Sequence, residues 1–135
     1  MKCRWLILVC LMPFFSFPAM AEEEEKLADE VRYVDLKPPF VTNYGGPGKL
    51  KYVKAEISLR VDSQEAYRAV NSHIPSLRHA IIMVLSQQTD DTVTTMEGKE
   101  QIRLQALSDL QEVMAKEEGG KMIEDLLFSS FFVQR

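Results

Sequence analysis

The sequence predicts an α+β domain in which an antiparallel or mixed sheet is packed by two main helices. Three observations predict this class. Residues 49–62 alternate apolar and polar side chains, the pattern of a strand with one buried face. Residues 74–87 and 94–116 repeat apolar side chains at helical spacing. Residues 122–133 form a final apolar, strand-like stretch, so strands come both before and after the helices.

Residues 1–21 have the three-part layout of a secretory signal peptide. A short basic start is followed by an apolar segment, which ends in Ala19-Met20-Ala21. This A-x-A pattern predicts cleavage after Ala21. Residues 5–21 are uncharged, and their length is at the lower edge of the ~17–25 residues that span a bilayer. A short membrane anchor is therefore the alternative, although two prolines interrupt it.

The rest of the chain reads as one globular domain preceded by an acidic leader. Residues 22–30 are dominated by acidic side chains and are expected to be a flexible, solvated leader. Residues 31–135 have the length of a single domain, and the 46% hydrophobic and 27% charged content is that of an ordinary soluble chain. The formal net charge of -4 is no basic footprint, so no nucleic acid partner is expected. Cys3 and Cys10 both lie in the predicted signal peptide, and the mature chain would contain no cysteine.

The first strand-like region is interrupted by prolines. Residues 31–36 are rich in β-forming side chains, residues 37–39 read Lys-Pro-Pro, and residues 40–44 resume extended sequence. Two prolines remove two backbone donors, which indicates a sheet edge or a loop. Residues 45–48, Gly-Gly-Pro-Gly, predict a turn.

The clearest strand follows this turn. Alternate side chains of residues 49–62 point one way and include Val53, Ile57 and Val61. Leu50 and Tyr52 are apolar, but they fall at the positions that point the opposite way from that series. This predicts either a β-bulge near Tyr52 or contact with a neighbour.

Two helices are predicted next. A short helix over residues 64–71 begins at Asp62 or Ser63 as the N-cap. A central helix over residues 74–87 carries Pro75 in its first turn, and residues 77, 81, 84 and 85 form its apolar face. Ile82 and Met83 widen that face, so we expect the last two turns to be covered on most sides. The alternative is that Ile82 or Met83 faces another chain.

The second half closes with a long helix and a strand. Residues 89–92 are expected to form a loop, and Thr94 with Glu97 predicts a capping box that starts a helix ending before Gly119. Residues 126–133 are apolar on both faces, which is typical of a central strand. The alternative is an edge strand that pairs with another subunit.

We identify no catalytic cluster in the sequence. His73 and His79 are six residues apart, about 240° around a helix, so they do not share a face. No G-x-S-x-G setting surrounds a serine, and neither a metal nor a cofactor site is predicted. We therefore expect a protein that works through its surfaces rather than an enzyme. Its candidate interaction residues are Ile82, Met83 and Phe131.

Five segments in order carry a resemblance to a known family. They are YVDLKPPFVTNY at residues 33–44, KYVKAEISLRVD at 51–62, HIPSLRHAIIMVLSQQT at 73–89, TMEGKEQIRLQAL at 95–107 and IEDLLFSSFFVQ at 123–134. In this order they resemble the FliL family of flagellar basal body-associated proteins over nearly the whole mature chain.

The resemblance implies a non-enzymatic flagellar motor accessory with a stomatin/prohibitin-like periplasmic domain at the inner membrane. It implies rings around the stator units, support of torque and of swimming or swarming, and a link to rotational control in chemotaxis. The partners implied are copies of the chain, other FliL-type subunits and stator proteins. Family members usually have a longer membrane-spanning helix, from which residues 1–21 depart. The alternative function is a periplasmic ligand-binding or sensory module.

Overall fold

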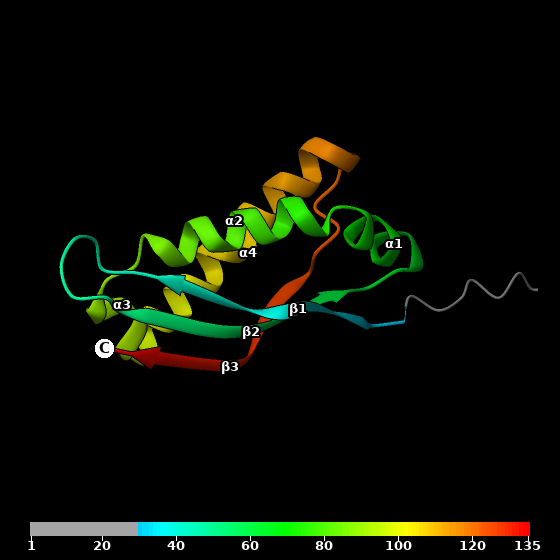
Figure 1. Ribbon diagram of the computed structural model, residues 1–135. Helices are drawn as coiled ribbons and strands as arrows, with labels where there is room; N and C mark the ends of the chain where they lie inside the picture. The colour runs from blue at the N-terminus through cyan, green and yellow to red at the C-terminus, as the bar shows by residue number, and fades with distance from the viewer. Residues whose placement is uncertain (1–29) are drawn as a thin grey trace, which may run out of the picture.

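The computed structural model describes residues 30–135 (Figure 1). The predicted cleavage after Ala21 and the acidic leader up to residue 29 lie outside the described residues. The elements follow in the order β1 (Arg32–Asn43), β2 (Tyr52–Val61), α1 (Gln64–Ser72), α2 (Ile74–Ser86), α3 (Asp90–Thr94), α4 (Met96–Glu118) and β3 (Asp125–Gln134).

The three strands form one antiparallel sheet in the order β1-β2-β3. Helices cover one face of it. In Figure 1, α2 and α4 lie over the same side of the strands, and α2 contacts β1 while α4 contacts β3. The predicted α+β class, with an antiparallel sheet packed by two main helices, is confirmed. No helix covers the other face within residues 30–135, and we call this face the open sheet face.

The central strand β2 has the predicted alternation. Every second side chain is buried against the helices, at 53, 55, 57, 59 and 61, and each is at most 2% exposed. The predicted bulge near Tyr52 is wrong, because Tyr52 pairs regularly with Asn43 and with Gln134. Tyr52 is in phase with the outward residues of β2 and lies on the open sheet face. The irregularity of β2 is instead between Glu56 and Ile57, opposite β3.

β1 is the edge strand that its prolines predict. It runs past residues 37–39, with a shift of pairing register between Leu36 and Phe40. Successive N–H groups of a strand point to opposite edges, so one of the two missing donors would face solvent, and the other falls where the pairing with β2 is interrupted. Helix α2 is tied to this irregularity. Arg78 donates a 2.7 Å hydrogen bond to the Pro38 carbonyl, and its guanidinium lies 4.1 Å from the centroid of the Phe40 ring.

The helix starts are close to those predicted, with two corrections. Ser63 is the N-cap of α1, because its Oγ accepts the amide hydrogen of Ala66 at 3.0 Å. The expected loop at residues 89–92 is wrong, since α3 begins there with a capping box between Thr89 and Thr92. The cap of α4 is Thr95 rather than Thr94, because α3 extends through Thr94.

The helix bodies match the predicted apolar faces. In α2 the predicted residues Leu77, Ile81, Val84 and Leu85 are buried. In α4 the buried residues are Gly98, Ile102, Ala106, Leu110 and Met114. Gly119 ends α4 at φ 78°, a left-handed conformation that glycine adopts without a Cβ penalty.

β3 is an edge strand, so the expectation of a central strand is wrong. Its only sheet neighbour within residues 30–135 is β2. One set of its side chains, including Phe128 and Phe131, packs partly buried under the helices. The other set, including Leu127 and Phe132, lies on the open sheet face. Apolar residues on both faces thus mark a strand whose outward side chains have no cover in the described chain.

Helices α3 and α4 approach most closely at Gly98, which is buried. A Cβ at this position would lie 2.7 Å from the Thr92 carbonyl carbon, closer than real Cβ atoms come. Gly98→Ala should therefore destabilise the fold by about 1–3 kcal/mol, measured by chemical denaturation. Gly120→Ala is the control, because its Cβ would lie 3.6 Å from Met122 Cε, an ordinary contact. Equal stability of the two variants would contradict this close α3–α4 contact.

Candidate interaction surface

The outer side of α2 is apolar and almost uncharged. Ile82 is 39% and Met83 46% exposed, so the predicted cover of the last two turns is absent within residues 30–135. At about 100° per residue, both residues point away from the buried stripe. Arg78 is the helix's only permanently charged side chain, and it turns toward β1. We define the α2 outer face as Pro75, Ser76, His79, Ile82, Met83 and Ser86.

A groove between α2 and α4 adjoins this face. It has a volume of about 460 Å³, and Pro75, Ser76 and His79 belong to both the groove and the α2 outer face. The α4 side of the groove supplies Val113, while Lys116 and Glu117 place one charge of each sign on the wall. The whole surface is suited to an apolar segment with a few polar contacts.

Phe131 lies apart from Ile82 and Met83. Its ring is on the helix-covered side of β3, edge-on to Phe128 with 5.1 Å between the ring centroids. Lys99 Nζ lies 5.3 Å from the Phe131 centroid. Because α2 turns its buried stripe toward the sheet, its outer face and Phe131 are on different sides of the helix layer. The structure therefore divides the predicted interaction residues between two places.

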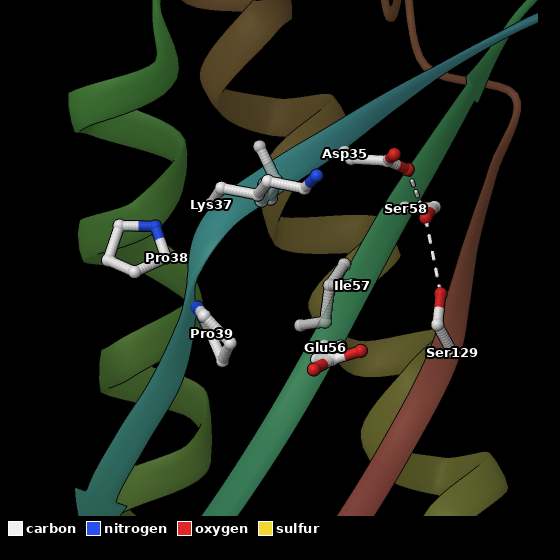
Figure 2. A pocket seen from close by; sticks show the side chains of 9 residues that line it. Asp35, Lys37, Pro38, Pro39, Glu56, Ile57, Ser58 and Ser129 are labelled. Atoms are coloured by element: carbon white, nitrogen blue, oxygen red, sulfur yellow. Dashed lines mark hydrogen bonds between the residues drawn. The ribbon is translucent and has the colours of Figure 1, made fainter.

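The open sheet face contains a depression of about 770 Å³ beside the prolines of β1 (Figure 2). Ser58 donates a 2.6 Å hydrogen bond to Asp35 Oδ1, and its oxygen lies 3.3 Å from the Ser129 hydroxyl. Since Ser58 has one hydroxyl hydrogen, Ser129 is the donor in the second contact. This chain of hydrogen bonds crosses all three strands. None of the residues lining the depression is a histidine, so its serines have no imidazole base.

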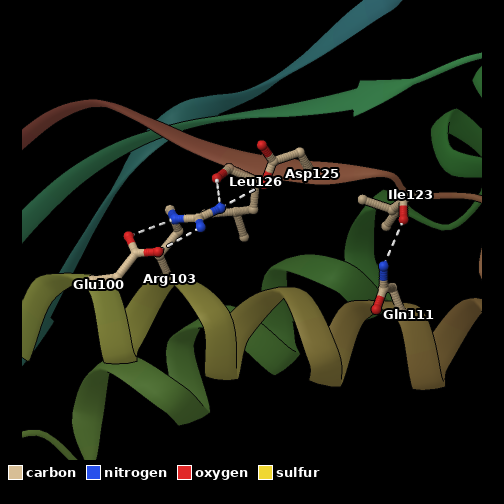
Figure 3. A network of polar contacts seen from close by, with 6 residues as sticks. All are labelled: Glu100, Arg103, Gln111, Ile123, Asp125 and Leu126. Atoms are coloured by element: carbon tan, nitrogen blue, oxygen red, sulfur yellow. Dashed lines mark hydrogen bonds and ion pairs between the residues drawn. The ribbon is translucent and has the colours of Figure 1, made fainter.

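An arginine network fastens the start of β3 to α4 (Figure 3). Arg103 Nη1 donates to Asp125 Oδ1 at 2.5 Å and to the Leu126 carbonyl at 3.3 Å. Arg103 also forms two hydrogen bonds with Glu100, at 2.6 and 2.8 Å. These hydrogen bonds lower the pKa of Glu100 and raise the pKa of Arg103. In the same view, the Gln111 amide donates to the Ile123 carbonyl at 2.8 Å.

A second polar cluster joins the β1–β2 turn to α3. Asp90 accepts hydrogen bonds from Lys51 Nζ at 2.5 Å and from the Tyr44 hydroxyl at 2.9 Å. Both bonds favour the charged carboxylate and lower the pKa of Asp90, the Lys51 bond most. Burial, and then the bond to Asp90, raises the pKa of Tyr44. The Gly45 amide also donates to the Gln88 carbonyl at 3.1 Å. The cluster therefore ties the β1–β2 turn to the start of α3.

Residues 30–135 contain neither a metal-ligating cluster nor a membrane-spanning helix. No three His, Cys, Asp or Glu side chains among residues 30–135 are grouped to hold a metal ion. His73 Nε2 donates a 2.7 Å hydrogen bond to Glu118 Oε1, and His79 lies on the α2 outer face. In this same part of the chain, no helix is both long and apolar enough to cross a membrane.

Comparison with known proteins decides the family. Residues 33–134 match the family described as "Flagellar basal body-associated protein FliL". The chain belongs to the FliL family. It is also 32% identical over 99 residues to the protein named "Flagellar protein FliL" of Aquifex aeolicus (strain VF5). That alignment covers 73% of this chain and 59% of the relative, so the chain spans less than two thirds of the relative's length.

The sequence of this FliL-family chain pointed to Ile82 and Met83 as candidate interaction residues, and both are exposed. It did not predict the groove or the depression. The groove had one available signal, since residues 79–88 contain no Asp, Glu, Lys or Arg in a chain that is 27% charged. The depression had none, because Asp35, Ser58 and Ser129 are brought together only by strand pairing.

The Asp90 cluster makes stability depend on pH in a defined direction. The folded pKa lies below the ordinary value of 3.8, so the contribution is present above that value and is lost as the pH falls through the folded pKa. Asp90→Asn should lower the denaturation midpoint at about pH 7, and the difference from wild type should shrink toward about pH 3.

Asp91→Asn is the matched control, since the Asp91 carboxylate makes no hydrogen bond or ion pair within residues 30–135. Its midpoint should follow wild type at each pH. A difference for Asp90→Asn that stays constant down to about pH 3 would contradict the charged tie.

Proposed function

We propose that this chain is a non-enzymatic accessory of the flagellar motor, associating with the basal body and its stator. The observation that carries the proposal is the FliL match, which spans residues 33–134. Apart from the first residue of β1, the match includes all three strands and all four helices of the described chain. In this role the protein supports torque, swimming or swarming motility and rotational control in chemotaxis, through contacts with other proteins.

We place this domain in the periplasm beside the inner membrane. Residues 1–21 carry the three-part pattern of a signal peptide, and residues 31–135 then form the periplasmic domain. In the anchored alternative, residues 1–21 stay attached and hold the domain at the membrane. N-terminal sequencing separates the two forms, because the cleaved form begins at Glu22 and the anchored form retains Met1.

Self-association is proposed to use the α2 outer face. Ile82 and Met83 expose apolar surface on a stretch of α2 that carries no Asp, Glu, Lys or Arg, and the cores of protein interfaces are likewise depleted of charged residues. A head-to-tail ring needs a second, different patch. The open sheet face supplies one candidate, since Tyr33 is 53% and Val41 63% exposed there. Copies of the chain, other FliL-type subunits and the periplasmic part of the stator are the proposed partners.

The motor role is tested by deletion of the gene. We expect impaired swimming or swarming in cells that still assemble filaments, because an accessory acts on the motor rather than on filament export. Swimming speed at normal and raised viscosity, swarm expansion and filament staining measure this. Wild-type motility in every assay would overturn the motor role.

The proposed contact is tested by Met83→Glu. A charge placed on the α2 outer face should weaken self-association by at least about tenfold, measured by analytical ultracentrifugation of the full chain. Met83 is 46% exposed, so the free energy of unfolding should change by less than about 0.5 kcal/mol. Met96→Glu is the control, because Met96 is 86% exposed at the start of α4. Equal effects of the two variants would contradict a specific contact.

A second candidate function is a periplasmic ligand-binding or sensory module. The depression on the open sheet face favours it, because Asp35, Ser58 and Ser129 present polar groups beside Pro38 and Pro39. Asp35→Ala separates the two functions. If the protein is a motor accessory that works through the α2 outer face, cells with this variant should retain wild-type motility. If it is a ligand-binding module, they should lose the response to the ligand.

A further inference from the structure

The outer edge of β3 has the features of a strand that pairs with another strand. Within residues 30–135, no strand lies beyond β3 in the sheet. Natural edge strands are usually protected by charges or prolines, and β1 carries Lys37, Pro38 and Pro39 on the opposite edge. From residue 126 to residue 134, β3 has no charged side chain and no proline. A bulge beside Ser129 is its one protective feature.

The sequence of β3 is nearly palindromic. Residues 126–133 read Leu-Leu-Phe-Ser-Ser-Phe-Phe-Val, so apolar and polar positions mirror one another about the Ser129–Ser130 bond. Burial follows the same symmetry. Phe128 and Phe131 are half-buried beneath the helices, while Leu127 and Phe132 are exposed on the open sheet face. This mirror pattern favours antiparallel pairing of the strand with its own copy, because each residue then meets a similar residue from the other half.

We propose that two copies of this chain pair their β3 strands antiparallel about a two-fold axis between Ser129 and Ser130. Leu127 then lies opposite Phe132 of the second copy, and Phe128 lies opposite Phe131. The two sheets form one six-stranded sheet, with the helices of both copies on the same face. The predicted interaction residue Phe131 has its place in this contact.

The bulge determines the register of the pairing. Side chains alternate between faces along each half of β3, and the alternation changes phase at the two serines, which are both exposed. In the proposed register every opposed pair belongs to the same face. A shift by one residue places half-buried side chains opposite exposed ones along the strand. A shift by two places Phe128 opposite Ser129 in one direction, and in the other it places Phe131 opposite Ser130 and Phe132 opposite Ser129.

Exposure and backbone contacts set the extent of the pairing. Leu127 is 38% and Phe132 59% exposed in the single chain, and opposed side chains about 5 Å apart would cover each other. Arg103 already donates to the Leu126 carbonyl, so the network around Asp125 marks one end of the available edge. The central pairing is therefore residues 127–132 with their counterparts.

A second copy fits this edge better than an unrelated segment does. The near-palindrome of β3 and its lack of charge favour self-pairing in particular, whereas pairing with a foreign strand would not depend on a palindrome. The contact does not use the α2 outer face and does not rest on the motor role. Both contacts can form in one assembly, since α2 lies over the opposite edge of the sheet from β3.

Disulfide trapping tests the register. Leu127→Cys and Phe132→Cys are made separately in full-length chains that carry Cys3→Ser and Cys10→Ser, and the purified proteins are mixed and oxidised. We expect mixed disulfide dimers, because directly opposed residues are close enough to bridge. Each variant alone should yield few dimers, since its two cysteines would be roughly 16 Å apart along the strand. Val41→Cys mixed with Phe132→Cys measures chance collisions, because Val41 is 63% exposed on the far strand.

Two double variants, each with two charged side chains in place of Leu127 and Phe132, test the same contact without cysteine. Leu127→Lys with Phe132→Glu should keep the dimer, because each lysine meets a glutamate of the second copy. Leu127→Lys with Phe132→Lys should raise the dimer Kd at least about tenfold, since both contacts become repulsive. Sedimentation measures the Kd, and thermal melts establish that both variants fold.

Several outcomes would overturn the pairing. These are mixed dimers no more abundant than in the Val41 control, equal dimer yields for single and mixed variants, and equal Kd values for the two charge variants. A wild-type chain that stays monomeric at every concentration would overturn it as well. Loss of association in Met83→Glu together with an unchanged Leu127→Lys, Phe132→Lys variant assigns self-association to the α2 outer face and rejects the β3 pair.

Discussion

The burial of one face of β2 is the constraint on which the rest of this structure depends. Val53, Ile57, Leu59 and Val61 are at most 2% exposed, and they can be buried only if helices lie on that side. A three-stranded sheet has two faces, and α2 and α4 are packed over one of them. The polar residues of β2 therefore define an open sheet face, and both sheet edges are formed by strands with a single neighbour. The surfaces proposed for interaction all follow from this one-sided cover.

Polar contacts hold the two helices over that sheet at chosen points. Arg103 joins α4 to the first residues of β3, and Arg78 joins α2 to the irregular part of β1. The Asp90 carboxylate joins α3 to the β1–β2 turn through Lys51 and Tyr44. Each contact lies at the periphery of an apolar core that contains no buried charged residue in the described chain. These ties position the elements, while burial of apolar side chains supplies most of the stabilisation.

The proposed contact through α2 and the proposed contact through β3 differ in symmetry. The α2 outer face combines the exposed apolar side chains of Ile82 and Met83 with polar residues of the same helix, and its use in a ring requires a different patch on the next copy. The β3 edge is self-complementary, and its use in a pair requires only a second identical strand. The two proposed contacts of this FliL-family domain therefore combine a head-to-tail arrangement with a two-fold one. The depression on the open sheet face is lined by residues of all three strands, and Ser129 belongs both to it and to the proposed β3 contact.

Every element except α3, and the inward faces of these elements, could be predicted from the sequence. Alternation at residues 53–61 and helical spacing in α2 and α4 depend on neighbours along the chain, so the buried positions could be read directly. Tertiary structure decided how these elements are placed. Whether β3 is central or at an edge depends on the order of the strands in the sheet, and the two-faced apolar pattern of residues 126–133 does not encode that order. The cap at Thr95 follows from α3, which forms where Asp90 meets Lys51 and Tyr44 from a distant hairpin. The separation of Phe131 from Met83 likewise could not be predicted from the sequence, because the packed helix layer places the two residues on different sides.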